Sequence, residues 1–457
     1  MSAINSSIYE DIEISAETTT GKGDTLDLRL GVVKFNYFED LFSPTITAEI
    51  LVASAGNATN KAGDVLETVY SGLPIRGGER VKINIAPNTK TNKPLKFDTP
   101  DTYLYVSNVS RQFSDGAKEL FTLDLVSREA ITNETSRLSE KYYKTSPISD
   151  TVKKIIETKL ASTIDEKNID RTVNTYPFIG NLKTPFHTLV WLASKSQPEK
   201  GLPGYFFYQT KDGFNFRSIE SLIKGKSDPK FTYFERKFTQ SSRIIDTLDD
   251  TIISYNVSQN NDLLTKLMLG QFSSHIMEFD PLTGYFTTEE QGKFTLDDST
   301  NQKINFSKPE KSDNVVKTED VETLGATPEI PVLLNDEKQN LGSLPSRMIT
   351  MVADRGALQF EPSIEKGSTP TLWQRQALMR YQVLFTQIVN MLVPLNTNLV
   401  VGDIINIKFL NANMEAKEHD RRQSGNYMIK SLCHSFDANQ SVTSLTLVRD
   451  AFGEISK

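Results

Sequence analysis

Residues 402–409, Gly402-Asp403-Ile404-Ile405-Asn406-Ile407-Lys408-Phe409, decide the fold of this chain, because a matching stretch occurs near residue 80. The earlier stretch reads Gly78-Glu79-Arg80-Val81-Lys82-Ile83-Asn84-Ile85. Each begins with a glycine and an acidic residue and continues with alternating apolar and polar side chains. That alternation is typical of a β-strand with one buried face.

The similarity between the two copies continues downstream. The first copy goes on through residues 104–109 to Phe113, then 123–126, and closes with Arg128-Glu129-Ala130. The second goes on through residues 427–432 to Phe436, then 445–448, and closes with Arg449-Asp450-Ala451. The spacing from glycine to phenylalanine differs by a single residue. Two matched three-strand units predict one β-domain used twice; the alternative is a chance likeness between short alternating strands.

Length and composition describe a folded protein of several domains. At 457 residues the chain exceeds what one core normally supports, and about three domains are expected. The net charge of −7 gives no basic excess of the kind that nucleic-acid binders carry. The single cysteine, Cys433, excludes an internal disulfide bond and fits folding in a reducing cytosol. Residues 1–17 do not form a signal peptide pattern, and no run approaches the ~18 apolar residues of a membrane-spanning helix.

The remaining patterns predict secondary structure. Strands are expected at 32–37, 45–52, 81–85, 121–125, 251–257 and 384–393, with a hairpin turn at 114–116. Helices are expected at 149–160, capped by Ser149-Asp150, at 186–193 and after residue 368, and an aromatic hairpin at 205–219. A small closed barrel or a sandwich suits the first strands, because closure removes exposed sheet edges. The polar residues 290–345 indicate a long insertion or arm outside the core.

No catalytic, cofactor or metal site is predicted. The four histidines, His187, His275, His419 and His434, do not have metal-ligand spacing, and no phosphate loop or nucleophile elbow is present. Cys433 and His434 are adjacent, so on a strand they point to opposite faces and cannot act as a nucleophile–base pair. We interpret Cys433 as a small core residue and His434 as a structural histidine. Carboxylate pairs 289–290 and 297–298 are interpreted as solvated charge.

The aromatic residues at 205–216 permit two interpretations. They could form a platform on which a carbohydrate or a receptor stacks, or they could belong to a strand buried on both faces. We favour the core interpretation. A platform requires exposed rings, so burial of Tyr205 and Phe207 would count against it.

The motifs, taken in order, resemble the central baseplate hub protein of contractile-tailed bacteriophages, with late-control D proteins and the hub part of VgrG spikes as relatives. The likeness rests on residues 40–44 before a strand, Gly78-Glu79, the hairpin 204–219, and 393–451. It touches most of the chain except residues 285–345, which are extra or expanded. No lysozyme-like region or β-helical repeat is found after Ala451, so a separate polypeptide is expected to supply the spike.

The resemblance implies a mainly β fold with an α+β middle domain, two similar tube-type β-barrels and a polar insertion. The implied domains are 1–135, first barrel; 136–228, α/β middle domain; 229–290, start of the second barrel; 291–368, polar insertion or arm; and 369–457, helix and remainder of the second barrel. The implied assembly is a homotrimer whose six barrels form a pseudo-sixfold ring. This ring would join the hexameric tail tube to a trimeric spike and would line a channel for DNA.

A structural role of this kind needs no catalytic residue, and we expect no enzymatic activity. Expected partners are a second and third copy of the chain, a trimeric spike protein, a tail-tube or tube-initiator protein, the tape measure protein and possible baseplate wedge proteins. DNA would pass without specific binding, no membrane insertion is expected, and the location would be the tail baseplate of a virion made in the host cytoplasm. The alternatives are a carbohydrate- or receptor-binding virion protein, the hub of a non-phage contractile injection system, and a hydrolase built around His187.

Overall fold

A computed structural model describes most of the chain. The described residues are 3–16, 25–54, 58–59, 66–67, 75–87, 89–115, 118–143, 146–199, 202–235, 249–259, 262–281, 284–286, 293–297, 305–306, 323–325, 341, 344, 346–352, 370–411 and 419–451.

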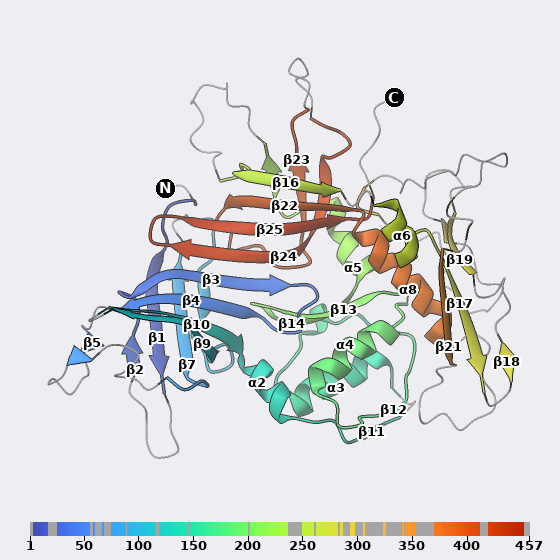
Figure 1. Cartoon of the computed structure of the whole chain (residues 1–457), viewed down its shortest axis with the longest axis horizontal. Helices are drawn as coiled ribbons and strands as arrows, with labels where there is room; N and C mark the ends of the chain where they lie inside the picture. The colour runs from blue at the N-terminus through green and yellow to red at the C-terminus, as the bar shows by residue number, and fades with distance from the viewer. Residues whose placement is uncertain are drawn as a thin grey trace.

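The N-terminal part of the chain forms a first β unit. Its strands are β1 (Ile8–Ser15), β2 (Thr25–Asp27), β3 (Val32–Asp40), β4 (Thr47–Ser54), β7 (Arg80–Ala86), β8 (Leu95–Phe97), β9 (Leu104–Asp115) and β10 (Lys118–Ser127). Short strands β5 (Ala58–Thr59) and β6 (Leu66–Glu67) pair separately. Figure 1 shows β1, β2 and β7 running across the direction of β3 and β4, so the unit is rolled rather than flat.

A second β unit is assembled from distant parts of the sequence. Its strands are β15 (Thr232–Phe234), β16 (Ser254–Gln259), β22 (Gln387–Pro394), β23 (Ile404–Lys408), β24 (Gly425–Asp437) and β25 (Ser441–Arg449). The strand order β16-β22-β25-β24-β23 matches the order β3-β4-β10-β9-β7 of the first unit, strand for strand. The two similar β units predicted from the sequence are therefore present.

The registers of the two units agree as well as the strand orders. Arg80 pairs with Tyr105 in the first unit, and the corresponding pair in the second is Ile404 with Met428. Each unit also carries a β-bulge at the same place. Ser107 is the extra residue between β9 and β10, and Lys430 is the extra residue between β24 and β25. A shared bulge favours duplication over chance, because bulges are specific features of a family's backbone.

The units differ at the phenylalanines that the sequence placed in parallel. A further bulge between Ser110 and Phe113 occurs in β9, whereas β24 continues in unbroken register here. Phe113 consequently lies opposite Leu120, at the position that Ser435 takes opposite Val442 in the second unit. Phe113 is 62% exposed and Phe436 only 1%. The bulge therefore turns Phe113 out of the core. The one-residue difference in spacing arises earlier, between the opening glycine and Tyr105 or its counterpart Met428.

Both units belong to one sheet. The described residues include a 14-stranded sheet in which β24 of the second unit pairs antiparallel with β3 of the first. One hydrophobic core runs through both units, from Ile83 and Phe121 in the first to Val389 and Ile405 in the second. Full burial of an aliphatic or aromatic side chain stabilises a fold by about 1.5–3 kcal/mol, so this shared core ties the two units together.

The middle of the chain forms a small α/β domain. Its elements are α2 (Arg128–Thr135), β11 (Lys141–Tyr142), α3 (Ile148–Lys159), η1 (Glu166–Asn168), β12 (Phe178–Ile179), α4 (Pro185–Lys195), β13 (Tyr205–Thr210), β14 (Gly213–Ser218), α5 (Ile219–Ile223) and η2 (Lys224–Ser227). Its core is separate: Val152, Ile155 and Leu189 from the helices pack with aromatic rings of the β13–β14 hairpin.

The predicted helices and hairpin of the middle domain are confirmed. The predicted cap is wrong, because α3 begins after Pro147 and the Ser149 N–H donates to Thr172 Oγ1.

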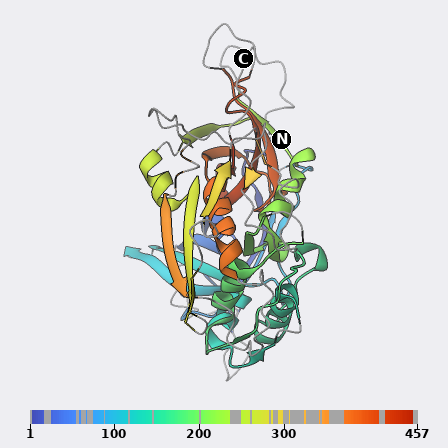
Figure 2. The same cartoon turned by 90° about the vertical axis from the view of Figure 1, so that its right-hand side faces the viewer.

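A further sheet lies at one side of the molecule. It contains β17 (Ser273–Asp280), β18 (Tyr285–Phe286), β19 (Lys293–Asp297), β20 (Asn305–Phe306) and β21 (Arg347–Val352), with helices α6 (Leu263–Leu269) and α8 (Pro370–Leu384). Figure 2 shows its strands standing beside α8.

Three sequence expectations need correction here. The stretch 229–290 does not belong wholly to the second barrel, because β17 forms its own sheet. The insertion is not entirely outside the core, since Leu324 is buried in the core of the two β units. The strand expected at 384–393 begins at Gln387, because Leu384 still ends α8.

Candidate assembly interface

The junction between β24 and β3 shows how one β unit joins another. Ser431–Asp437 pairs with Lys34–Asp40 in continuous antiparallel register, for example Ser435 opposite Asn36. Across it the rings of Phe35 and Phe436 lie 5.8 Å apart. Main-chain pairing of this kind is independent of side-chain identity, and the buried rings fix its register.

A buried carboxylate reinforces the junction. Glu39 accepts hydrogen bonds from Tyr37 Oη at 2.8 Å, from the Val401 N–H at 3.0 Å and from the Lys211 N–H at 2.8 Å. These donors come from the first unit, the second unit and the turn between β13 and β14. Burial raises the pKa of the Glu39 carboxyl, while the backbone donors act in the opposite direction. Glu39 therefore connects three parts of the molecule at one point.

A second buried centre ties the middle domain to the end of the second unit. Arg380 on α8 is fully buried, and its guanidinium donates to Glu220 Oε1 at 3.0 Å and to Asp450 Oδ2 at 2.8 Å. Removal of one partner from a buried ion pair costs about 3–5 kcal/mol, because it leaves an uncompensated charge. Arg380 thus joins the middle domain to the end of the second unit.

Each unit also has an edge that no described strand covers. Beyond Val106, β9 pairs with β10 on one side only, and in the part of the chain that the structure describes β16 pairs with β22 alone. Large apolar side chains are exposed at both edges: Phe113 on β9, Leu120 on β10, and Ile253 and Tyr255 at β16. An uncovered strand edge is a template for pairing with another chain.

The open edges are the counterparts of the strands that form the junction. By strand order β9 corresponds to β24, and β16 corresponds to β3. The junction inside the chain joins β24 of the second unit to β3 of the first. The counterparts of these two strands, β9 in the first unit and β16 in the second, keep open edges. The sequence analysis predicted the repeat but did not identify this interface, because strand pairing between distant segments leaves no local pattern.

The residues considered earlier for other chemistry lie as follows. Tyr205, Phe207 and their neighbours on both strands of the hairpin are buried, which confirms the core interpretation and removes the aromatic platform. His187 is exposed on α4, away from a hydrogen-bonded carboxylate or hydroxyl among the described residues. His434 is fully buried, with Nδ1 3.0 Å from Thr443 Oγ1, and is structural.

The other residues considered in the sequence analysis are placed as follows. Cys433 is half-buried rather than fully in the core, and burial raises the pKa of its thiol to about 11, which keeps it protonated. The carboxylate pair 289–290 and residue 298 lie outside the described residues, as do the side chain of Asp297 and Gly116 of the predicted turn. Within the described ranges no group of acidic, histidine or cysteine side chains could hold a metal ion. No described helix is long and apolar enough to cross a bilayer.

Comparisons with known proteins agree with this architecture. No protein-family model and no curated protein sequence matches the chain. Among solved structures, the tail protein from Neisseria meningitidis MC58 is similar at a TM-score of 0.50 and 10% identity, over 97% of this chain and 96% of that one. The tail protein of prophage MuSo2 from Shewanella oneidensis gives a TM-score of 0.48 at 10% identity, over 96% and 98%. An E. coli type VI secretion component similar to the T4 phage tail proteins gp27 and gp5 gives 0.40 at 8% identity, over 93% and 76%.

The first of these likenesses extends over nearly the full length of both chains. The chain thus shares its fold with that tail protein, which agrees with the resemblance noted from the sequence.

Proposed function

We propose that this chain is the structural hub of a contractile tail and that three copies close into a ring of six β units. The observation that carries the proposal is the junction itself. Strand β24 meets β3 inside the chain, and the counterparts of these two strands, β9 and β16, keep open edges. Head-to-tail contacts between unlike edges generate a ring when the rotation closes.

The threefold number comes from the hub family that the sequence resembles. Two units per chain and three chains give a pseudo-sixfold ring, which would match a hexameric tail tube on one face and a trimeric spike on the other. Such a ring covers the open edges of β9 and β16 and needs no catalytic group. A tape measure protein and DNA would pass through its channel, wedge proteins are further candidate partners, and the location would be a virion baseplate. The hub of a non-phage contractile injection system would use the same ring.

The register inside the chain predicts the register between copies. Asn256 on β16 takes the position of Asn36 on β3, and Phe113 on β9 takes the position of Ser435 on β24. Since Asn36 and Ser435 are directly opposite, we expect Phe113 of one copy to lie opposite Asn256 of the next. Both side chains are exposed in the single chain and are available for this contact.

A cysteine cross-link tests both the ring and its size. Phe113→Cys and Asn256→Cys are introduced together in a Cys433→Ser background, and the protein is oxidised and run on a non-reducing gel. Covalent species that end at the trimer, near three times 51.3 kDa, are expected, because directly opposite β-carbons come within disulfide reach. The control pairs Phe113→Cys with Tyr255→Cys, whose side chain points to the opposite face of β16.

Two outcomes contradict the hub. One is a protein that stays monomeric at every concentration, with and without a candidate spike protein, and does not cross-link. The other is a ladder that continues past the trimer, which indicates an open filament instead of a closed ring.

A further inference from the structure

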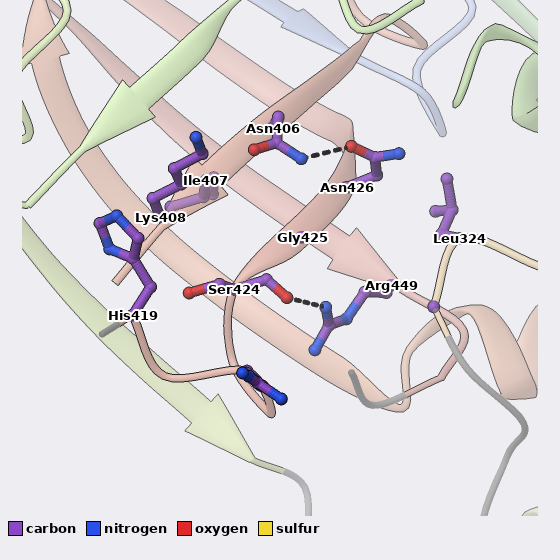
Figure 3. Close-up of a pocket in the computed structure, with 11 residues that line it drawn as sticks. Leu324, Asn406, Ile407, Lys408, His419, Ser424, Gly425, Asn426 and Arg449 are labelled. Carbon is purple, nitrogen blue, oxygen red and sulfur yellow. Dashed lines mark hydrogen bonds between the residues drawn. The ribbon is translucent and has the colours of Figure 1, made fainter. Parts of the chain in front are cut away.

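A polar pocket of about 480 Å³ opens in the second β unit, away from the β9 edge. Its walls come from the end of β23, from the turn that leads into β24, and from residues 323–325 (Figure 3). The backbone N–H of Leu324 donates to Asp450 Oδ1 at 2.8 Å, which fixes the 323–325 wall in place. The described lining of the pocket includes no residue of β9 or β16, the strands proposed to close the ring.

The described lining carries positive charge and no acidic side chain. Lys408, His419, Arg421 and Arg449 contribute the basic groups, together with the neutral polar Asn406, Ser424 and Asn426. Asp420 lies on the same turn, but its Oδ1 accepts the backbone N–H groups of Arg422 and Gln423. In a protein with a net charge of −7, this is a local site of the opposite sign.

The charge of Arg449 has no carboxylate partner among the described residues. The side chain is fully buried, and its guanidinium donates to the carbonyl oxygens of Ser424 at 3.0 Å and Arg422 at 2.7 Å and to Gln387 Oε1 at 2.5 Å. Its Nε has no hydrogen-bond partner in the part of the chain that the structure describes. Burial lowers the pKa of Arg449, as expected for a cation that is poorly compensated.

Arg380 provides a direct contrast close by. It is buried to the same degree, yet two carboxylates, Glu220 and Asp450, neutralise it. Asp450 follows Arg449 in the chain, but its oxygens bond to Arg380 and to the Leu324 N–H. Buried charges are normally paired, so an unpaired one beside a pocket indicates that its counter-ion comes from outside.

The first β unit has no arginine at the position of Arg449. In the matching registers of the two units, Leu125 takes the place of Leu447, so Ser127 takes the place of Arg449. The buried arginine beside the pocket is therefore a feature of the second unit.

We propose that this pocket receives a carboxylate group of a partner polypeptide, either an acidic side chain or a chain terminus. Lys408, His419 and Arg421 would meet the carboxylate at the mouth, and the charge of Arg449 would attract it through the pocket wall. Gly425 allows the close approach of that wall, since a β-carbon there would lie 3.0 Å from Arg449 Nη1. Within a tail, such a pocket would orient one neighbouring protein on each second β unit.

Fluorescence anisotropy with labelled peptides tests the proposal at low ionic strength. The probes are an amidated oligoglutamate, an oligoglutamine with a free terminal carboxylate, and an amidated oligoglutamine that carries no carboxylate. Binding of the first identifies acidic side chains as the ligand, and binding of the second alone identifies a chain terminus. The third is expected not to bind.

Matched variants locate the binding site. Lys408→Gln is expected to weaken binding roughly ten- to hundredfold, the range for a lost hydrogen bond to a charged group. Lys167→Gln removes the same charge from an exposed lysine on η1 and should leave binding unchanged. Ser424→Asp places a negative charge in the pocket lining, so it should weaken binding of the carboxylate peptides.

Failure of both carboxylate peptides to bind the full-length protein would overturn the proposal. Equal weakening by Lys408→Gln and Lys167→Gln would overturn it as well, because the attraction would then be non-specific. The oligomeric state is measured on the same samples. A monomer that binds the peptides refutes the ring and leaves the pocket, so the two proposals fail separately.

Discussion

The two β units share strand order, register and one bulge, yet they differ wherever the second unit meets the rest of the chain. In the first unit the residue after the bulge, Phe113, faces solvent, while in the second the junction strand buries Phe436 against Phe35. Gly78, which opens the first copy, has free space around it, whereas Gly402, which opens the second, lies against Tyr208. A duplicated fold therefore keeps its backbone and changes its surfaces to suit each neighbour.

The largest difference is expected from truncating the two phenylalanines. Phe436→Ala should lower the free energy of unfolding by about 3–5 kcal/mol, because it removes a buried ring from a packed core. Phe113→Ala should change it by less than about 0.5 kcal/mol, as for other exposed positions, while weakening assembly. Chemical denaturation of the monomer checks the first value, and sedimentation checks the second effect. Similar losses of stability in both variants would show that the bulge does not separate their environments.

The paired glycines give a smaller and more specific comparison. Gly78 and Gly402 have φ values of +91° and +89°, a region that costs a residue with a β-carbon about 1–2 kcal/mol. A β-carbon at Gly402 would also lie 2.8 Å from Tyr208 Oη, whereas nothing lies within 4 Å of one at Gly78. Gly402→Ala should therefore be less stable than Gly78→Ala by about 1–3 kcal/mol, the cost of overpacking. Equal midpoints in thermal denaturation would mean that Tyr208 moves aside freely.

The smallest effect concerns pH, and it should come from the second unit, whose β24 carries a buried histidine. Burial, with a contribution from Lys211, lowers the pKa of His434 to about 3, below the usual value of 6.5. Between these values the unfolded chain binds the proton more readily than the folded one. The stability that His434 contributes is therefore complete above pH 6.5 and falls as the pH drops. The loss is about 1.4 kcal/mol per pH unit, or about 2 kcal/mol at pH 5.

His434→Gln isolates this contribution. Denaturation of the variant and of the original protein at several pH values between 7 and 4.5 should show a shallower slope in the variant. The buried Glu39, whose pKa is raised, titrates in both proteins and so cancels in the difference. Parallel slopes would mean that His434 becomes protonated without cost in the folded state.

Part of the fold could be predicted because its signals are local. Alternation at Val81, Ile83 and Ile85 indicates a strand with one buried face, and the spacing of Val152, Ile155 and Ile156 indicates a helix that packs on one side. The duplication was visible for the same reason, since glycines that need a positive φ recur at matching places. The end of α8 was less visible, because Leu384 is compatible with either a helix or a strand.

The candidate interface could not be predicted in this way. The contact of β24 with β3 joins residues almost 400 positions apart, such as Ser431 and Asp40, and no local pattern records it. The place of Phe113 was also beyond the sequence, because a bulge of one residue reverses the face on which a side chain lies. Arg380 has two carboxylate partners, whereas Arg449 has none among the described residues, and both facts follow from neighbours that only folding brings together.

The sequence by itself determined that this chain holds two related β units around a small α/β domain, because period-two alternation and recurrent glycines act within a few residues. Only the tertiary structure decided which strand edges are paired and which are left unpaired. The reason is that main-chain hydrogen bonds can form between any two strands, and side-chain packing selects the partner. It also decided which buried arginine is neutralised. A charge depends on groups within a few ångströms of it, and at Arg380 those groups, Glu220 and Asp450, lie far apart in the sequence.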